Sequence, residues 1–362
     1  MRRVIAVVAA CIFHANLAMA AEECSGRPNA IGTSRLIVVD PAEHGRIGSM
    51  QYPEMLPLAD KEVVLSFDDG PLPPYTGRIL ETLAAECVKA TFFMVGDMAQ
   101  AYPDWVRKVY NAGHTIGTHS QNHPRFFGRL NDERALGEID GGIASVEAAL
   151  GEPGALAPFF RFPGFGRTDA AERHLAARAI MTWGADVPAD DWKRISPAQV
   201  IARALDRLET KGRGVLLLHD IKPGTALALP VLLRELKARG FRIVHVVPAG
   251  PERPKTVTEP VAWASHPARA PVWPAVLAAQ PNVSPAPPEP GAPAAALAAP
   301  LGPKLAIPIK IAAEPRASAT PERRTAAAST RRARPARVRH AAMRMREPEQ
   351  SSGWFRFLNW FD

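Results

Sequence analysis

The chain has 362 residues, 47% of them hydrophobic, which is enough for one large domain or two ordinary ones with a substantial core. Its formal net charge is +8. The segment from Pro251 onward contains 16 Lys and Arg and 8 Asp and Glu, so its net charge equals that of the whole chain. The part before Pro251 is therefore electrically balanced, so the basic pI gives no support to a nucleic-acid-binding core, and we expect no nucleic-acid partner.

The first twenty residues have the three parts of a secretory signal peptide. A cationic start at Met1–Arg3 precedes an apolar run over 4–13 and a small-x-small cleavage site at Ala18–Ala20. We therefore expect residues 1–20 to be removed and the mature protein to be exported, to the periplasm or the extracellular space. The apolar run is short for a membrane span, and an uncleaved N-terminal anchor is the alternative.

Removal of the signal peptide takes Cys11 with it and leaves Cys24 and Cys87. Two cysteines in an oxidising compartment could pair. Cys87 also falls on the apolar side of a predicted helix with Ile79 and Leu83, where an unpaired cysteine behaves as a small core residue. A buried free thiol at Cys87 is therefore our expectation, with a disulfide as the alternative.

Between residues 58 and 248, short apolar strands alternate with amphipathic helices, whereas residues 21–57 show little periodicity and are expected to form an irregular N-terminal arm. The pattern predicts strands over 62–67, 90–95, 114–118, 159–163, 180–185, 214–219 and 241–247, and helices over 76–87, 103–112, 131–150, 170–179, 197–209 and 227–239. Asn131 or Asp132 and Ser196 are expected helix caps, and Gly240 is expected to close the last helix. About seven β-α units in a row predict parallel strands with helical crossovers.

After residue 248 this alternation stops. Residues 249–350 are rich in Pro, Ala and Arg, with seven arginines and no acid over 331–346, and are predicted to be a disordered linker. The end of the chain, 351–362, is dense in aromatic residues that would share one face of a short helix. A solvated extension, a peripheral contact with an anionic membrane or envelope polymer, and a small partner-binding helix are the alternatives for this tail.

Side chains that can carry chemistry stand where successive predicted strands end. In chain order they are Asp68 and Asp69, His119 and His123, Arg161, Asp190 and Asp191, and His219. The C-terminal ends of the strands build the site in a β/α barrel. Residues that are far apart in the sequence are therefore predicted to meet on one rim.

Three of these side chains form a candidate metal site. His119 and His123 are four residues apart, so a helical turn would place both imidazoles on one side to hold one ion. Asp69 supplies a third, hard ligand and leaves an open position. Two imidazoles and a carboxylate suit Zn²⁺ and other divalent metals such as Co²⁺. The ion would offset the repulsion between Asp68 and Asp69, and Asp68 would stay free as a base.

Five ordered segments resemble the motifs of the NodB-homology polysaccharide deacetylases, carbohydrate esterase family 4. They are Ser66–Pro71, His119–His123, Arg161–Gly164, Asp191–Trp192 and Leu217–Asp220. The resemblance covers residues 58–248. It implies an α/β fold, a distorted (β/α)₇ barrel, and metal-dependent removal of acetyl groups from N-acetylated sugars or, in some members, of O-acetyl groups from xylan.

The resemblance also implies a role for each matching position. The catalytic residues would be Asp68 as general base, Arg161 holding that base, His219 as general acid, and Asp191 tuning the pKa of the acid. The metal ligands would be Asp69, His119 and His123. The substrate-binding residues would be Trp192 and Leu217, which wall a pocket for the acetyl methyl group, with Pro163 and Gly164, whose backbone amide would face the oxyanion.

Two departures from the family pattern concern the site. Phe162 and Gly164 stand where the third motif usually has Pro and Tyr, so a different substrate cleft is expected. Asp190 and Asp191 are adjacent, and Asp191 is chosen because Trp192 follows it; Asp190 is the alternative.

The sequence thus predicts a secreted, monomeric hydrolase whose partner is an N-acetylglucosamine-containing polysaccharide, either peptidoglycan or a chitin-like polymer. An O-acetyl esterase or another amide hydrolase on the same scaffold is one alternative. A non-catalytic glycan- or envelope-binding protein is the other.

Overall fold

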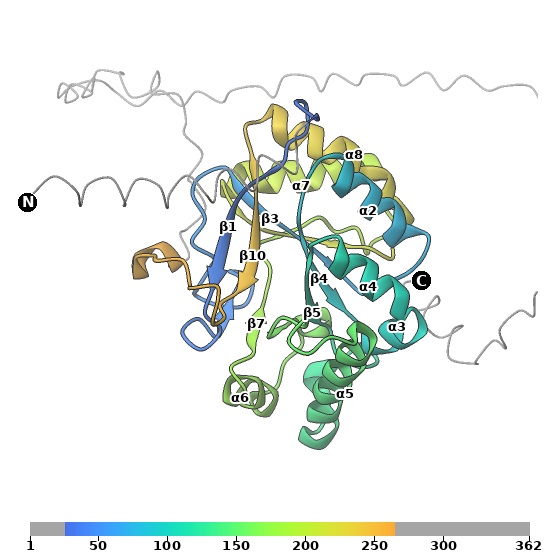
Figure 1. Ribbon diagram of the computed structural model, residues 1–362, viewed down its shortest axis with the longest axis vertical. Helices are drawn as coiled ribbons and strands as arrows, with labels where there is room; N and C mark the ends of the chain where they lie inside the picture. Colours follow the sequence, from blue (N-terminus) through green and yellow to red (C-terminus); the bar gives the residue numbers. More distant parts are fainter. Residues whose placement is uncertain (1–25, 265–362) are drawn as a thin grey trace, which may run out of the picture. The chain divides into compact units, whose positions relative to one another are not determined.

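The computed structural model describes residues 26–264, which form an α/β fold built on a ten-stranded sheet (Figure 1). The predicted signal peptide, the part of the predicted linker beyond residue 264 and the aromatic segment 351–362 lie outside the described residues. The disorder predicted from residue 249 is wrong for 249–264, which pack on the fold: Trp263 is buried in the core, and its carbonyl oxygen accepts the Met55 backbone N–H at 2.8 Å. Within 26–264, no helix combines the length and the hydrophobicity needed to cross a bilayer.

Strands and helices alternate along most of the described chain. The strands are β1 (Thr33–Val39), β2 (Arg46–Ile47), β3 (Glu62–Asp68), β4 (Thr91–Met94), β5 (Thr115–Thr118), β6 (Phe159–Phe160), β7 (Met181–Trp183), β8 (Val187–Pro188), β9 (Gly214–His219) and β10 (Arg242–Pro248). The helices are α2 (Tyr75–Ala85), α3 (Gly96–Ala101), α4 (Pro103–Asn111), α5 (Asp132–Leu150), α6 (Asp169–Ala177), α7 (Pro197–Lys211) and α8 (Pro223–Ala238), with 3₁₀ turns η1 (Phe127–Arg129), η2 (Pro163–Phe165) and η3 (Pro260–Trp263). The predicted caps Asn131 and Ser196 accept hydrogen bonds from the first turns of α5 and α7.

Strand β3 is the centre of a parallel sheet that curls into a distorted barrel. One side of β3 pairs with β9, and the other pairs with β10 at its start and with β4 at its end. The ladder continues from β4 through β5 and β6 to β7. Only Gly184–Asp186 separate β7 from β8, and β8 pairs with β9, so this stretch of chain closes the curl. The predicted fold class is confirmed.

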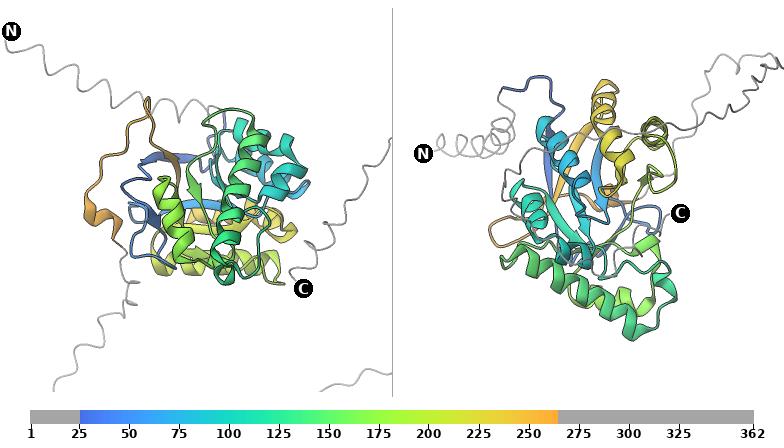
Figure 2. Two further views of the ribbon diagram at one scale, coloured as in Figure 1. Left: turned by 90° about the horizontal axis from the view of Figure 1, so that it is seen from below. Right: turned by 90° about the vertical axis from the view of Figure 1, so that its right-hand side faces the viewer.

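The two faces of the strands have different partners. Val63, Leu65 and Phe67 of β3 belong to a core that includes residues of α2, α4, α5, α7 and α8, and the helices cover this outer side of the strands (Figures 1 and 2). Val64 belongs instead to an inner cluster with Phe93, Trp183 and Val215. Because side chains alternate along a strand, Ser66 and Asp68 share the inner face with Val64. The interior is therefore apolar at the start of β3 and polar where β3 ends.

The prediction that residues 21–57 form an irregular arm is wrong for Thr33–Val39 and Arg46–Ile47, which form strands β1 and β2. Strand β1 pairs in parallel with β10, from Thr33 opposite Ile243 to Val39 opposite Pro248, and β2 pairs with β7. Strand β1 is fully buried at only two positions, Ile37 and Val39, so it lacks the continuous burial of the central strands. Its strand structure depends on hydrogen bonds to a partner about 200 residues away in the sequence, which local periodicity does not report.

The expected free thiol at Cys87 is also wrong, because Cys87 is disulfide-bonded. Helix α2 ends at Ala85, so Cys87 does not lie on its apolar side with Ile79 and Leu83; it is half-buried and has a φ of 52°. The other two cysteines of the chain lie outside the described residues.

Candidate active site

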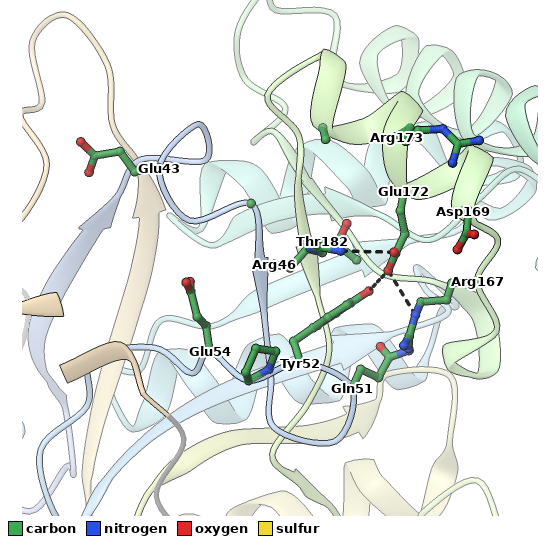
Figure 3. A pocket seen from close by; sticks show the side chains of 13 residues that line it. Glu43, Arg46, Gln51, Tyr52, Glu54, Arg167, Asp169, Glu172, Arg173 and Thr182 are labelled. Carbon is green, nitrogen blue, oxygen red and sulfur yellow. Dashed lines mark hydrogen bonds and ion pairs between the residues drawn. The ribbon is translucent and has the colours of Figure 1, made fainter. Parts of the chain in front are cut away.

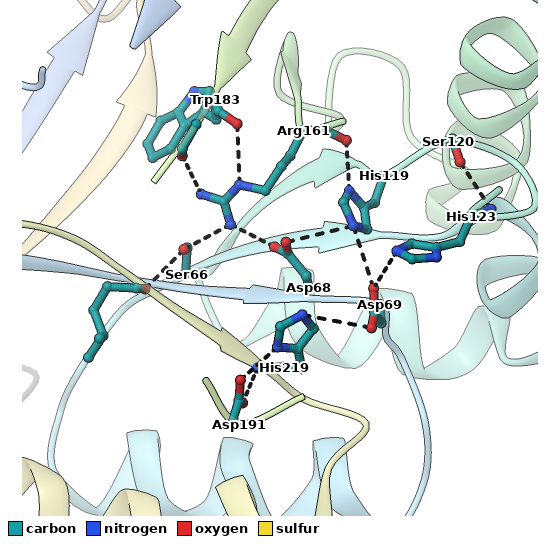
Figure 4. A network of polar contacts seen from close by, with 12 residues as sticks. Ser66, Asp68, Asp69, His119, Ser120, His123, Arg161, Trp183, Asp191 and His219 are labelled. Carbon is teal, nitrogen blue, oxygen red and sulfur yellow. Dashed lines mark hydrogen bonds and ion pairs between the residues drawn. The ribbon is translucent and has the colours of Figure 1, made fainter. Parts of the chain in front are cut away.

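The strand ends bring most of the predicted site residues into one buried polar cluster (Figure 4). Asp68, the last residue of β3, lies opposite His219, the last residue of β9, in the strand register. His119 directly follows β5, and Arg161 directly follows β6. All four side chains are at least nine-tenths buried. Parallel pairing is therefore what gathers residues from the ends of separate strands.

Asp69, His119 and His123 form a three-sided group whose ligand atoms lie within 4.8 Å of one another. The Asp69 Oδ1 atom lies 3.5 Å from His119 Nε2 and 3.3 Å from His123 Nε2. The two histidines lie on an irregular loop. The helical turn that their spacing of four residues suggested does not form. Ser120 has a φ of 67° and its hydroxyl accepts the His123 backbone N–H at 3.0 Å, which folds the loop back.

This group fits a divalent cation. Asp69 is 1% exposed, yet neither of its carboxylate oxygens accepts a hydrogen bond. His119 Nδ1 lies 2.7 Å from the Arg161 carbonyl oxygen, which can only accept, so Nδ1 carries the proton and the Nε2 lone pair faces Asp69. Burial and the neighbouring His123 hold the pKa of His119 well below its usual value, which keeps the ring neutral. Such a donor set suits Zn²⁺ and other divalent metals without selecting one.

Asp68 is held by a fully buried arginine. Arg161 Nη1 donates to Asp68 Oδ1 at 2.6 Å. The same guanidinium also donates to Ser66 Oγ at 2.9 Å, to the Gly184 carbonyl at 3.0 Å and to the Trp183 carbonyl at 3.3 Å. With its donors engaged on several sides, the guanidinium cannot turn away from Asp68 without breaking other hydrogen bonds.

Asp68 and Asp69 differ in their pKa although they are neighbours. Burial is the largest influence on Asp68 and, with the nearby Asp69 charge, raises its pKa to about 6, against the lowering effects of Arg161 and His219. Burial would also raise the pKa of Asp69, but the surrounding histidines, His123 first, lower it below its usual value. The environment therefore favours one permanent carboxylate and one carboxylate that titrates near neutral pH.

His219 is paired with Asp191. His219 Nδ1 lies 2.8 Å from Asp191 Oδ1, and the His219 backbone N–H donates to Oδ2 at 2.7 Å. Thr225 Oγ1 donates to the same Oδ2 at 2.6 Å. Burial alone would lower the pKa of His219, but the charges of Asp191 and Asp69 outweigh it and raise the pKa to about 9. The imidazole is therefore protonated at neutral pH, and its Nε2 lies 3.9 Å from Asp69 Oδ2.

The neighbouring Asp190 has a different environment. Its Oδ2 lies 2.9 Å from Lys193 Nζ, 2.7 Å from Arg203 Nη1 and 3.0 Å from Arg207 Nη2. Of the two adjacent acids, Asp191 is thus the one that contacts His219, as chosen from the sequence.

The four predicted substrate-binding residues lie near this cluster in two groups. The Trp192 ring meets the His219 ring edge-on, with 5.7 Å between centroids. Leu217 is 3% exposed and shares the inner face of β9 with His219. Pro163 and Gly164 begin η2, on the segment that follows Arg161; Pro163 is buried, whereas Gly164 is exposed and has a φ of 54°.

Asp220 is a member of the cluster to which the sequence analysis gave no role. It is 1% exposed; its Oδ2 accepts a hydrogen bond from Thr76 Oγ1 at 2.6 Å, and its Oδ1 accepts none. Burial, followed by the Asp69 charge, raises the pKa of Asp220 to about 7. A Cβ atom at Gly70 would lie only 2.1 Å from this carboxylate, so Asp220 packs directly on the turn that carries Asp69. Its position directly after His219 was the available signal.

A separate polar cavity of about 710 Å³ is lined by residues of β2, β7 and α6 and contains none of the predicted site residues (Figure 3). Glu172 is its centre: it accepts from Tyr52 Oη at 2.9 Å and pairs with Arg46 at 3.4 Å and Arg167 at 3.1 Å. Because Arg46 and Tyr52 lie 126 and 120 residues before Glu172 in the sequence, the Glu172 network joins the N-terminal segment to α6.

Comparison with known proteins gives matches of one kind. The family described as polysaccharide deacetylase matches residues 56–182. Peptidoglycan-N-acetylglucosamine deacetylase PgdA of Listeria monocytogenes is 30% identical over 200 residues, 55% of this chain but only 41% of that protein, so the chain spans less than half the length of that relative. A peptidoglycan-N-acetylglucosamine deacetylase of Bacillus cereus is 32% identical over 196 residues, 53% of this chain and 89% of that protein.

The structural comparison agrees. The peptidoglycan deacetylase Bd3279 of Bdellovibrio bacteriovorus superposes with a TM-score of 0.53 and 33% identity, over 60% of this chain and 59% of that one. The Bc1960 peptidoglycan N-acetylglucosamine deacetylase gives a TM-score of 0.50 and 26% identity, over 60% of this chain and 96% of that one.

Proposed function

Because the chain belongs to the NodB-homology family of polysaccharide deacetylases, we propose that it removes N-acetyl groups from an N-acetylglucosamine-containing polysaccharide, with peptidoglycan as the first candidate. The preference for peptidoglycan over a chitin-like polymer is supported by the names of its relatives, which include peptidoglycan deacetylases of Listeria, Bacillus and Bdellovibrio. Export through the signal peptide at residues 1–20 is part of the proposal, since peptidoglycan lies outside the cytoplasmic membrane.

Asp69, His119 and His123 would hold the metal, with Zn²⁺ or Co²⁺ as candidates. When bound, a divalent metal supplies a Lewis acid that polarises an acyl oxygen and makes a neighbouring water more acidic. The Asp69 carboxylate supports this assignment, because it is buried without a hydrogen bond while imidazole nitrogens stand 3.3–3.9 Å from it.

Asp68 is the proposed general base. Arg161 fixes its Oδ1, which leaves Oδ2, at 3.7 Å from His119 Nε2, on the side of the proposed metal ligands. A pKa of about 6, raised chiefly by burial, leaves the carboxylate ionised at neutral pH yet able to take a proton from the attacking water.

His219 is the proposed general acid. Asp191 holds the Nδ1 side of its ring, so the proton on Nε2 is the one available for the leaving amine. Hydrolysis of an amide requires protonation of the departing nitrogen, and an imidazole kept charged by Asp191 can donate that proton at neutral pH. Trp192 and Leu217 beside this ring are the proposed walls for the acetyl methyl group.

One observation carries the proposal. The proposed general acid His219, paired with Asp191, and the proposed general base Asp68, paired with Arg161, lie on either side of the Asp69 carboxylate, which has no hydrogen bond. A protein that only binds glycan has no need of both a base and an acid. Hydrolysis of a carbohydrate O-acetyl ester would use the same groups, so the substrate has to be ranked by experiment.

The test is acetate release by the purified full-length mature chain from peptidoglycan, from N-acetylglucosamine oligomers and from acetylated xylan. Each substrate is assayed with Zn²⁺ or Co²⁺ and again after chelation. We expect metal-dependent release that is fastest on peptidoglycan and is abolished in Asp68→Asn. Metal binding without release from any N-acetylated substrate would overturn the proposal, and release from xylan alone would replace it with the esterase activity.

A further inference from the structure

The loop that follows His123 carries an exposed aromatic ring, Phe126, next to a residue that is buried in the core, Phe127. Phe126 is 56% exposed, although a large apolar side chain is usually buried. The next residue, Phe127, is fully buried and meets the Phe162 ring edge-on, with 5.2 Å between centroids. The Arg129 backbone N–H also donates to the Phe126 carbonyl at 2.9 Å. Because Phe127 anchors the loop in the core, its neighbour Phe126 is kept at the surface.

Two arginines stand over this ring. The guanidinium carbon of Arg129 lies 4.9 Å from the Phe126 ring centroid, and that of Arg125 lies 5.4 Å from it. Both arginines are exposed, and within residues 26–264 neither forms an ion pair with an acid. Arg203 and Arg207, by contrast, share the carboxylate of Asp190. The charges of Arg125 and Arg129 are thus available to an anion from solution.

This Arg–Phe–Arg platform, defined as Arg125, Phe126 and Arg129, borders the candidate active site. Phe126 is three residues from the proposed metal ligand His123, so their Cα atoms are at most about 11 Å apart. The platform loop also packs on the segment of η2: a Cβ atom at Gly164 would lie 4.0 Å from the Arg125 carbonyl oxygen. The loop of the platform and the predicted substrate contacts of η2 therefore lie on neighbouring segments of the chain.

We propose that the Arg–Phe–Arg platform binds a sugar ring that carries a carboxylate, next to the sugar that is deacetylated. The inference rests on the proposed function and deepens it. The part of the Phe126 ring that the two guanidinium groups leave exposed offers an apolar contact to the C–H face of a pyranose, and guanidinium groups form charge-assisted hydrogen bonds with carboxylates. The lactyl-bearing sugar of peptidoglycan offers both features when its carboxylate is free, whereas a polymer of N-acetylglucosamine alone offers only the ring. The platform would then select anionic glycan over neutral glycan.

The test compares one glycan in two charge states. Peptidoglycan strands are freed of their peptides to expose the lactyl carboxylates, and half of the sample is amidated to neutralise them. The metal-loaded full chain is assayed on both strands as wild type, Arg125→Gln/Arg129→Gln, Phe126→Ala and a control, Arg234→Gln. Arg234 is also exposed but lies on α8. Using the full chain throughout keeps the arginines of residues 331–346 common to every sample.

We expect wild type and Arg234→Gln to prefer the charged strands. The double arginine variant should lose about five-fold in kcat/KM on charged strands, mainly through KM, and stay within two-fold of wild type on amidated strands. Phe126→Ala should lose about five-fold on both strands. The preference of the wild type should also weaken as salt is added.

A binding measurement separates this inference from the proposed function. Dissociation constants for labelled charged and amidated strands are measured for the same platform variants in an Asp68→Asn background. If wild type releases no acetate but the double arginine variant still loses affinity only for charged strands, the function fails and the platform stands. If the double variant matches Arg234→Gln in both binding and turnover, the platform assignment is overturned.

Discussion

Asp68 and Asp69 show how two identical neighbours acquire different chemistry from their surroundings. Asp69 leaves the strand with a φ of 79°, and this turn directs its carboxylate toward two imidazoles, whereas Asp68 remains on the inner face of β3 against Arg161. Asp190 and Asp191 repeat the pattern, since one pairs with three cations and the other with His219. At the scale of single residues, the direction in which each carboxylate points therefore determines which charged partners it has.

The raised pKa values of Asp68 and His219 predict a bell-shaped pH dependence of kcat/KM. The proposed base must be deprotonated, so activity should fall as pH drops through the pKa of Asp68, which burial raises to about 6 in the metal-free protein. The proposed acid must be protonated, so activity should fall as pH rises through the pKa of His219, which Asp191 and Asp69 raise to about 9 against burial. A cation bound to Asp69 should move both limbs to lower pH. A rate profile measured from pH 4 to 11 checks both limbs.

Asp191→Asn should displace the basic limb, with Asp190→Asn as its matched control. Without the Asp191 charge, only Asp69 and Asp68 oppose the effect of burial on His219, so its pKa should fall, the basic limb should move to lower pH and kcat should fall by about 10²-fold or more. Asp190→Asn removes the shared partner of Arg203 and Arg207 and should reduce thermal stability without moving that limb. Equal pH profiles for the two variants would contradict the assigned pairing.

At the scale of elements, the turn between β3 and α2 is held by a side chain that follows the neighbouring strand β9. Asp220 follows β9, yet it accepts a hydrogen bond from Thr76 in the first turn of α2 and fills the space beside Gly70. Thr76 Oγ1 in turn accepts the Leu72 backbone N–H at 2.8 Å. The position of Asp69 is thus determined by side chains of two other elements.

Gly70→Ala should disturb this turn, whereas Gly137→Ala should not. A methyl group at Gly70 would lie 2.1 Å from the Asp220 carboxylate, so either the turn or Asp220 must move, which we expect to reduce the free energy of unfolding by about 1–3 kcal/mol. Gly137 lies on the exposed side of α5, with nothing within 4 Å of its Cβ position, and alanine there should stabilise the helix by about 0.5–1 kcal/mol. Denaturant titrations and metal-affinity measurements check the pair, and unchanged metal affinity in Gly70→Ala would show that the turn does not position Asp69.

The contact between β10 and β5 predicts a pH dependence of stability. His245 Nε2 lies 2.9 Å from Thr115 Oγ1, and burial, followed by the charges of Lys89 and Arg253, lowers the pKa of His245 from 6.5 to about 3. Below pH 6.5 the unfolded chain binds a proton that the folded chain does not. This stabilising contribution is therefore complete above pH 6.5 and is lost as pH falls toward 3, by about 1.4 kcal/mol per pH unit.

His245→Gln should remove this dependence and make the stability curve shallower by that slope below pH 6.5. Measurement at pH 8, where the wild-type side chain is neutral in both states, gives the cost of the substitution itself. Parallel curves for variant and wild type between pH 4 and 6.5 would contradict the assignment.

At the scale of the whole molecule, parallel pairing joins strands that are far apart in the sequence, such as β3 with β9 and with β10, and the polar interior end of the barrel depends on that pairing. The proposed metal ligands come from the ends of β3 and β5, and the base and acid pairs bring in β6, β8 and β9. An ion bound to Asp69, His119 and His123 would link the ends of β3 and β5 and bind only the folded state. Binding of metal at this proposed site would therefore be coupled to global stability.

Addition of Zn²⁺ or Co²⁺ to chelated protein should raise the free energy of unfolding by about 2.7 kcal/mol when the free ion is at 100 times its dissociation constant. Asp69→Asn should abolish this stabilisation, whereas Asp140→Asn, an exposed acid on α5, should keep it. Thermal unfolding with and without the ion checks the prediction, and an Asp69→Asn protein that is still stabilised by metal would exclude this site.

The alternation of strands and helices, the parallel topology and the residues at the strand ends could all be predicted from the sequence. These properties depend on local periodicity, capping residues and the connection rules of β-α units, all of which are present in a short window of sequence. The tertiary structure alone decided that residues 33–39 form β1, that Cys87 does not lie on the apolar side of α2, and that Asp220 packs against Gly70 and Thr76. In each case the outcome depends on where a helix ends or on contacts between segments distant in the chain, and local sequence preferences do not encode the free energy of such contacts.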